Sequence, residues 1–83
     1  MKCNKLFVII GAYTDERGYT DLTKPQVFKA KRTALKYLKS MYKEYIRDYS
    51  DSIVEIEFDK EKLAVAFDAT SECYEIIELE VKE

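Results

Sequence analysis

Few residues of this 83-residue chain have the chemistry of a catalytic or metal site. The sequence contains no His, the side chain that most often acts as base, proton shuttle or metal ligand near neutral pH. Cys3 and Cys73 stand in no motif that would activate a thiolate and at no spacing used for zinc. Asp15, Glu16 and Asp21 do not follow the spacing of a calcium loop. The sequence therefore predicts no catalytic residue, no cofactor and no metal site, and it favours binding over catalysis.

Basic residues recur at intervals of three and four between positions 32 and 47. On an α-helix these side chains fall within an arc of about 80°, opposite the apolar positions, and we call them the basic ridge: Arg32, Lys36, Lys39, Lys43 and Arg47. One interpretation is contact with nucleic-acid phosphates or with an acidic protein surface. The alternative is a solvated helix face that is rich in Lys. Three lysines against two arginines favour weak, nonspecific contact over bidentate recognition.

Acidic residues dominate the second half of the chain. The net charge of −2 divides into +7 for residues 1–47 and −9 for residues 48–83. Alternation along strands predicts that five acids share the outward face of a sheet, far from the basic ridge: Glu55, Glu57, Asp59, Glu78 and Glu80. One interpretation is a mimic of nucleic-acid phosphates that docks on a basic groove of a larger protein. The alternative is ordinary strand alternation with solvated Glu, although Glu is a poor strand former.

The elements that position these residues follow from the apolar periodicity. An uninterrupted apolar run at residues 6–13 predicts a strand that is covered on both faces or central in a sheet. Apolar residues at helical spacing predict an amphipathic helix over residues 31–48. The predicted fold is an α+β two-layer sandwich, with this helix on a mainly antiparallel sheet of four to five strands in the order β-(β)-α-β-β-β.

Three strands are predicted after the helix, at residues 53–59, 63–69 and 73–81. In the first of them the inward residues are expected to be Val54, Ile56 and Phe58. The last strand changes its apolar phase at residues 76–77, which predicts a bulge there. Before the helix, Val27 and Phe28 are expected to form a very short edge strand.

Seven tyrosines raise the question of base stacking on single-stranded nucleic acid. Helical spacing favours a packing role for Tyr42, Tyr45 and Tyr49. Tyr19 and Tyr37 are the tyrosines expected to be more exposed.

The sequence also bears on location. The apolar stretch near the start is too short for a secretory signal, and no segment reaches the ~20 apolar residues of a membrane span. We expect a single domain over residues 1–83, a cytoplasmic location and reduced thiols. A bridge between Cys3 and Cys73 would require the first and last strands to lie side by side.

Residues 27–38 start with Val-Phe and continue with Ala34-Leu35 and Tyr37-Leu38. This segment resembles the helix entry of small uncharacterised α+β orphan proteins of phages and mobile elements, in which a short strand leads into a helix with the same Ala-Leu-x-Tyr-Leu pattern. The resemblance covers a dozen residues. It implies an accessory role, because such proteins are often accessory factors and some of them inhibit host defence complexes.

We therefore expect a non-enzymatic protein-binding accessory or inhibitor module with a protein partner and no membrane partner. Weak nucleic-acid binding by the basic ridge is an alternative. A second alternative is a self-associating structural protein, whose homodimer forms through an edge strand or through oppositely charged faces.

Overall fold

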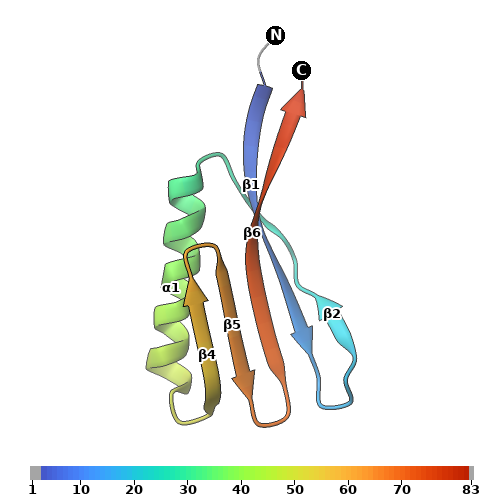
Figure 1. Ribbon diagram of the computed structural model, residues 1–83, viewed down its shortest axis with the longest axis vertical. Helices are drawn as coiled ribbons and strands as arrows, with labels where there is room; N and C mark the ends of the chain where they lie inside the picture. The colour runs from blue at the N-terminus through green and yellow to red at the C-terminus, as the bar shows by residue number, and fades with distance from the viewer. Residues whose placement is uncertain (1–2, 83) are drawn as a thin grey trace.

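The computed structural model describes residues 3–82, in which one helix packs on a six-stranded antiparallel sheet (Figure 1). Neighbouring strands follow the order β2-β1-β6-β5-β4, and β3 also pairs with β1. The predicted two-layer α+β fold is confirmed, with one strand, β2, beyond those predicted. The elements are β1 (Cys3–Thr14), β2 (Thr20–Leu22), β3 (Gln26–Phe28), α1 (Lys31–Tyr49), β4 (Ile53–Asp59), β5 (Lys62–Phe67) and β6 (Ser71–Lys82).

The two longest strands, β1 and β6, form the centre of the sheet and pair along their whole length. Because β3 pairs with β1 only from Phe7 to Ile9, the far end of the β1–β6 pair is a ribbon of two strands that extends past the helix (Figure 1). The longest dimension of the molecule is 50 Å. Its radius of gyration is 14.4 Å, whereas a compact domain of this length has about 12 Å. The chain is therefore elongated.

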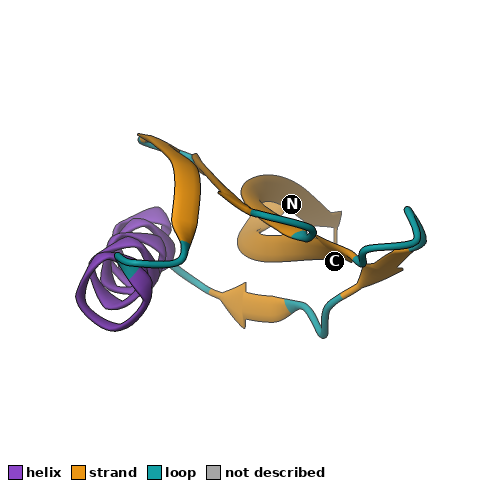
Figure 2. Cartoon of the chain, turned by 90° about the horizontal axis from the view of Figure 1, so that it is seen from below, coloured by secondary structure: helices purple, strands orange, loops and turns teal. Residues whose placement is uncertain are grey.

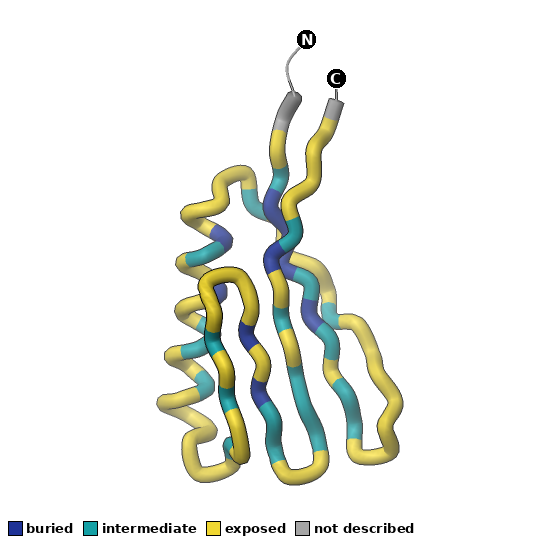
Figure 3. Tube along the Cα trace, in the orientation of Figure 1, coloured by how far each residue is buried: buried dark blue, intermediate teal, exposed yellow. Residues whose placement is uncertain are grey.

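The core lies between α1 and one face of the sheet. Seen from below, the strands form one curved layer and the helix lies against one side of it (Figure 2). Buried positions concentrate in the middle of β1 and β5 and on the inward side of α1 (Figure 3). The buried cluster consists of Phe7, Ile9, Ala34, Leu38, Leu63, Val65 and Ile76. We call the opposite side of the sheet the open face.

The helix begins without a side-chain cap. Its N-cap residue is Ala30, and its first turn holds no acidic residue, so nothing within that turn offsets the positive end of the helix dipole. An acid from another part of the chain lies nearby instead: Glu61, in the turn between β4 and β5, forms a 2.9 Å ion pair with Lys31. The turn therefore brings a negative charge to the start of α1.

Two irregularities differ from the prediction. No bulge occurs at residues 76–77, because β6 pairs with β1 without a shift. The register shift lies instead between Ile53 and Glu55 on β4. It leaves Val54 69% exposed, so the prediction that Val54 faces the core was wrong, while Ile56 and Phe58 do pack against the core.

The short strand β2 was missed because a turn creates it. The Asp15 carboxylate accepts hydrogen bonds from the backbone N–H groups of Arg17 and Tyr19, and Gly18 adopts a φ of +89° that other residues rarely adopt. This turn directs the chain back along β1, where three residue pairs form.

The two cysteines lie at opposite ends of the same strand pair. Although β1 and β6 are side by side, Cys3 pairs with Lys82 and Cys73 pairs with Ala12. Nine positions of a strand span about 30 Å, so a bridge between them within one chain is excluded. No helix in residues 3–82 has the length and apolar character that crossing a bilayer requires.

Candidate interaction surfaces

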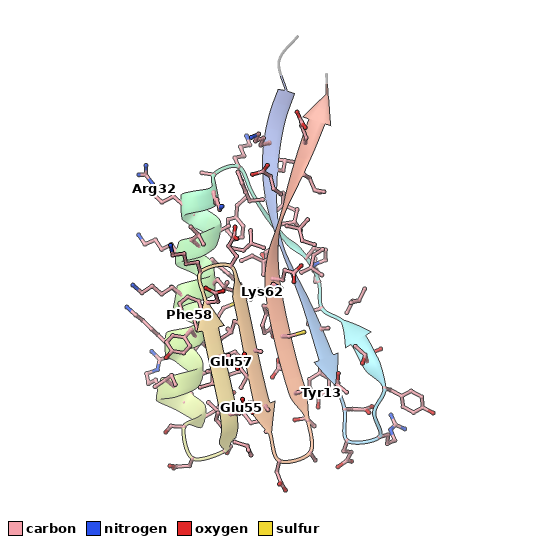
Figure 4. The ribbon with its side chains drawn as sticks, viewed as in Figure 1. Tyr13, Arg32, Glu55, Glu57, Phe58 and Lys62 are labelled. Carbon is pink, nitrogen blue, oxygen red and sulfur yellow. The ribbon has the colours of Figure 1, made fainter. Side chains whose placement is uncertain are left out.

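The basic ridge lies on the side of α1 that faces away from the sheet. Its five residues are all exposed, and Arg32 points outward from the helix (Figure 4). Arg47 donates two hydrogen bonds to the Asp48 carboxylate, at 2.9 and 3.1 Å. These bonds raise the pKa of Arg47 and lower the pKa of Asp48. Within residues 3–82, the other four ridge residues form no ion pair, so the ridge presents four uncompensated cations.

Three of the predicted acids lie together on the open face, along the edge strand β4. We call Glu55, Glu57 and Asp59 the acidic strip, and Figure 4 labels its two glutamates. Alternate residues of a strand are about 7 Å apart, and the partners of the two glutamates on β5 are Ala66 and Ala64. Small neighbours leave these carboxylates uncovered. No side chain of the described residues forms an ion pair with the strip.

The other two predicted acids do not join the strip. Without a bulge in β6, Glu78 and Glu80 share the face of Ile76, which is the face that α1 covers. Glu78 forms a 3.7 Å ion pair with Lys5 and raises the pKa of Lys31 slightly, after the larger effect of Glu61. The prediction that all five acids share one outward face was therefore wrong for these two.

The open face also carries an apolar band that the sequence analysis did not single out. Its residues point away from the helix, as the strand registers show. Val8 is only 7% exposed yet lies outside the core cluster, whereas Val27 is 60% and Leu79 is 49% exposed. The apolar band consists of Leu6, Val8, Val27, Ile77, Leu79 and Val81.

A shallow hollow of about 270 Å³ adjoins the apolar band on the open face. Ile10, Ala12 and Ile77 line it from β1 and β6, together with the exposed thiol of Cys73. The sequence contained a signal for this apolar surface, because residues 6–10 are apolar on both faces of their strand.

A polar cluster lies on the other face, at the margin of the core. The Glu72 carboxylate accepts hydrogen bonds from Tyr45 at 3.0 Å and from Tyr74 at 2.8 Å, and the two hydroxyls are 3.3 Å apart. Burial is the main reason that the pKa of each tyrosine is raised. The cluster keeps the hydroxyls neutral and fixes α1 against β6.

The other residues considered in the sequence, the loop acids and the tyrosines, form no further site within residues 3–82. Within residues 3–82 the structure brings together no group of three His, Cys, Asp or Glu side chains that could hold a metal. The Asp15 carboxylate is engaged in its turn, where hydrogen bonds from Tyr19 and Arg17 outweigh desolvation and lower its pKa. Tyr19 is 66% exposed and Tyr37 is 40% exposed, while Tyr42 stacks on Phe58 at 4.8 Å.

No protein-family model, curated protein or solved structure matches the chain.

Proposed function

We propose that this chain is a non-enzymatic protein-binding module, accessory or inhibitory to a larger complex, and that the open face is its contact surface. The observation that carries the proposal is the exposure of the apolar band on the same face of the sheet as the acidic strip. Large apolar side chains on a surface mark interaction sites when they are contiguous. The open face therefore combines an apolar contact area with charged residues at its edge, as protein interfaces do.

The accessible surface area supports the same proposal. The chain has 6433 Å² of accessible surface, whereas a folded monomer of 9.8 kDa is expected to have about 5,200 Å². The difference of about 1,200 Å² is comparable with the roughly 800 Å² that each partner buries in a specific complex. The chain exposes as much extra surface as an interface would cover.

The acidic strip indicates the chemistry of the partner. Three carboxylates in a row on an edge strand, none of which forms an ion pair within residues 3–82, attract a basic surface and repel nucleic acid, although Lys62 is the register partner of Asp59. A protein that presents a row of Lys or Arg side chains fits the strip. Such a partner is also expected to bind less tightly as the salt concentration rises.

The test is affinity capture by the immobilised chain from a lysate of the native host, with bound proteins quantified by mass spectrometry. The variant Glu55→Gln with Glu57→Gln removes two charges from the strip. The control, Glu16→Gln with Glu44→Gln, removes two charges elsewhere. We expect the first variant to lose a specific set of bound proteins and the control to keep it. Equal capture by both variants would contradict the role of the strip.

Nucleic-acid binding by the basic ridge is the second candidate, and the four uncompensated cations of the ridge favour it. The ridge spans about 22 Å along the helix, and the acidic strip lies on the opposite side of the molecule. Four phosphate contacts on duplex DNA predict a slope of about −3.6 for the logarithm of the binding constant against the logarithm of the salt concentration. Fluorescence anisotropy with labelled duplex measures this slope. Absence of binding at low salt would exclude the candidate.

A further inference from the structure

We propose that a second copy of this chain covers the apolar band, so that the protein is a two-fold symmetric dimer with the two open faces packed together. The inference rests on the proposed function, because it assigns part of that contact surface to a particular partner. Four observations support it: the composition of the central strand β1, the exposed area, the two-stranded ribbon and the position of the acidic strips.

The central strand β1 has the composition of a strand that is buried on both faces. In β1, Phe7 and Ile9 face the helix, while Leu6 and Val8 face the open side. Strands that are apolar on both faces belong to sheets with a layer on each side. Residues 3–82 supply only one such layer, the helix α1. A second layer must therefore come from outside these residues, and another copy of the sheet would supply it.

The two-stranded ribbon needs a cover as well. Beyond the pairing with β3, the open side of the ribbon carries Leu6 opposite Leu79, followed by Val81. Leu79 is 49% and Val81 is 41% exposed. A ribbon of two strands is marginally stable in water and usually needs a third strand or a packed face. Two sheets stacked about 10 Å apart would provide that face.

The position of the acidic strips is compatible with this arrangement, and the two other charged side chains of the same part of the open face, Lys62 and Glu75, form an ion pair with each other at 3.6 Å. A two-fold axis that runs along the β1–β6 pair places the apolar band of one copy on the band of the other. On the β6 side of this axis three strands lie side by side, whereas on the β1 side β2 and β3 share a single position beside β1. Each β4 therefore extends past the edge of the opposite sheet. The two acidic strips lie on opposite flanks, where each remains free to bind a basic partner.

The edges of the sheet argue against pairing by strand addition. On one edge, β4 carries the acidic strip and a register shift. On the other edge, β2 and β3 have three residues each and Pro25 lies between them. Charges, irregular register, short strands and Pro are the features that prevent edge-to-edge association. The edges of the sheet are therefore poorer candidates for self-association than the apolar band of the open face.

The test is sedimentation equilibrium of the full chain from micromolar to millimolar concentration. We expect the mass of the wild type to approach twice its chain mass of 9.8 kDa as the concentration rises and to fall toward one chain at the lowest concentrations. The variant Leu79→Lys with Val81→Lys should show the mass of one chain and an unchanged circular dichroism spectrum. The control is Ile46→Lys on the helix, where the side chain is 42% exposed and so matches Val81 in exposure. This control should stay dimeric.

If the double variant fails to fold, the test uses Val27→Lys on the edge strand β3 instead. This variant should also show the mass of one chain. A monomeric wild type, a larger open-ended assembly, or a dimer that persists in the folded band variants would overturn the inference. A monomer whose capture of proteins still depends on Glu55 and Glu57 would overturn the dimer alone and leave the proposed function intact. If instead the dimer depends on the apolar band but the capture of proteins does not depend on Glu55 and Glu57, the dimer stands and the proposed function is overturned.

Discussion

Replacing Gly11 with Ala should destabilise the protein, although the same change in an open strand would stabilise it. Gly11 is buried in β1 and pairs with Tyr74 of β6. A Cβ atom at this position would meet the Tyr74 ring and the Thr23 hydroxyl at distances that atoms do not tolerate. The glycine is therefore required by the aromatic ring that lies across it.

The expected loss follows from two opposing effects. Forcing an extra carbon into a packed site costs about 1–3 kcal/mol. If the Tyr74 ring moves away, its 2.8 Å hydrogen bond to Glu72 is lost, which costs about 1 kcal/mol more. In the opposite direction, replacing a glycine in a strand with Ala stabilises the fold by about 0.5–1 kcal/mol, because the unfolded chain loses backbone entropy. The free energy of unfolding should therefore fall by about 1–3 kcal/mol.

Urea unfolding followed by circular dichroism measures this change, with both proteins at the same chain concentration. A loss of 1 kcal/mol lowers the melting temperature of a domain of this size by about 4–8 °C. In a Tyr74→Ala background most of the obstruction is gone, so Gly11→Ala should cost much less there. An increase in stability for Gly11→Ala alone, or an equal loss in both backgrounds, would refute the reasoning.

Three further changes test the core and the polar cluster. Leu38→Ala removes a side chain that is 0% exposed and should lower the free energy of unfolding by about 2–5 kcal/mol; a loss below ~1 kcal/mol in urea unfolding would show that the site is not packed as described. Tyr45→Phe removes the hydrogen bond to Glu72 and should lower the free energy of unfolding by about 1 kcal/mol. The control is Tyr49→Phe, because the Tyr49 hydroxyl has no side-chain hydrogen bond in residues 3–82. This variant should change the free energy of unfolding by less than about 0.5 kcal/mol. Burial, followed by the contacts with Tyr74 and Glu72, raises the pKa of Tyr45 above its ordinary value of 10.0. The fold thus favours the neutral hydroxyl, so its contribution is complete below about pH 10 and declines above that value as the unfolded chain ionises. Unfolding measured against pH should show this alkaline decline, and Tyr45→Phe should make it shallower; an identical decline in the variant would contradict the role of Tyr45.

The periodic parts of the fold could be predicted from the sequence. Apolar residues at helical spacing gave a helix over 31–48, and the structure has Lys31–Tyr49. The alternation of Leu63, Val65 and Phe67 with small or polar residues predicts that these three side chains share one face of β5, and in the structure all three contact the core. These predictions succeeded because one face of each element is buried and the other is polar.

The errors occurred where both faces of a strand are apolar. Ile76 and Ile77 are consecutive, which suggested a bulge, but Ile77 lies on the open face within the apolar band. At the start of β4, Ile53 and Val54 are also consecutive, and there a register shift does occur. Alternation alone cannot distinguish the two cases, because each presents the same pair of apolar residues.

The candidate surfaces were predictable to different degrees. The basic ridge follows from helical spacing, and its exposure on α1 agrees with the prediction. The acidic strip was found, but the phase error in β6 added Glu78 and Glu80 to it. The apolar band was missed because an apolar strand is ordinarily assigned to the interior, whereas residues 3–82 supply a covering layer on one side of the sheet only.

The most direct test of the central claim is a dilution series followed by methyl NMR of Val and Leu side chains. If the open face is the contact surface between two copies, the methyl resonances of Val27, Leu79 and Val81 shift as the chain concentration falls. The methyl resonances of Val54, which is 69% exposed but lies outside the band, stay unchanged. Band resonances that do not respond to dilution in a wild type of single-chain mass would contradict the account.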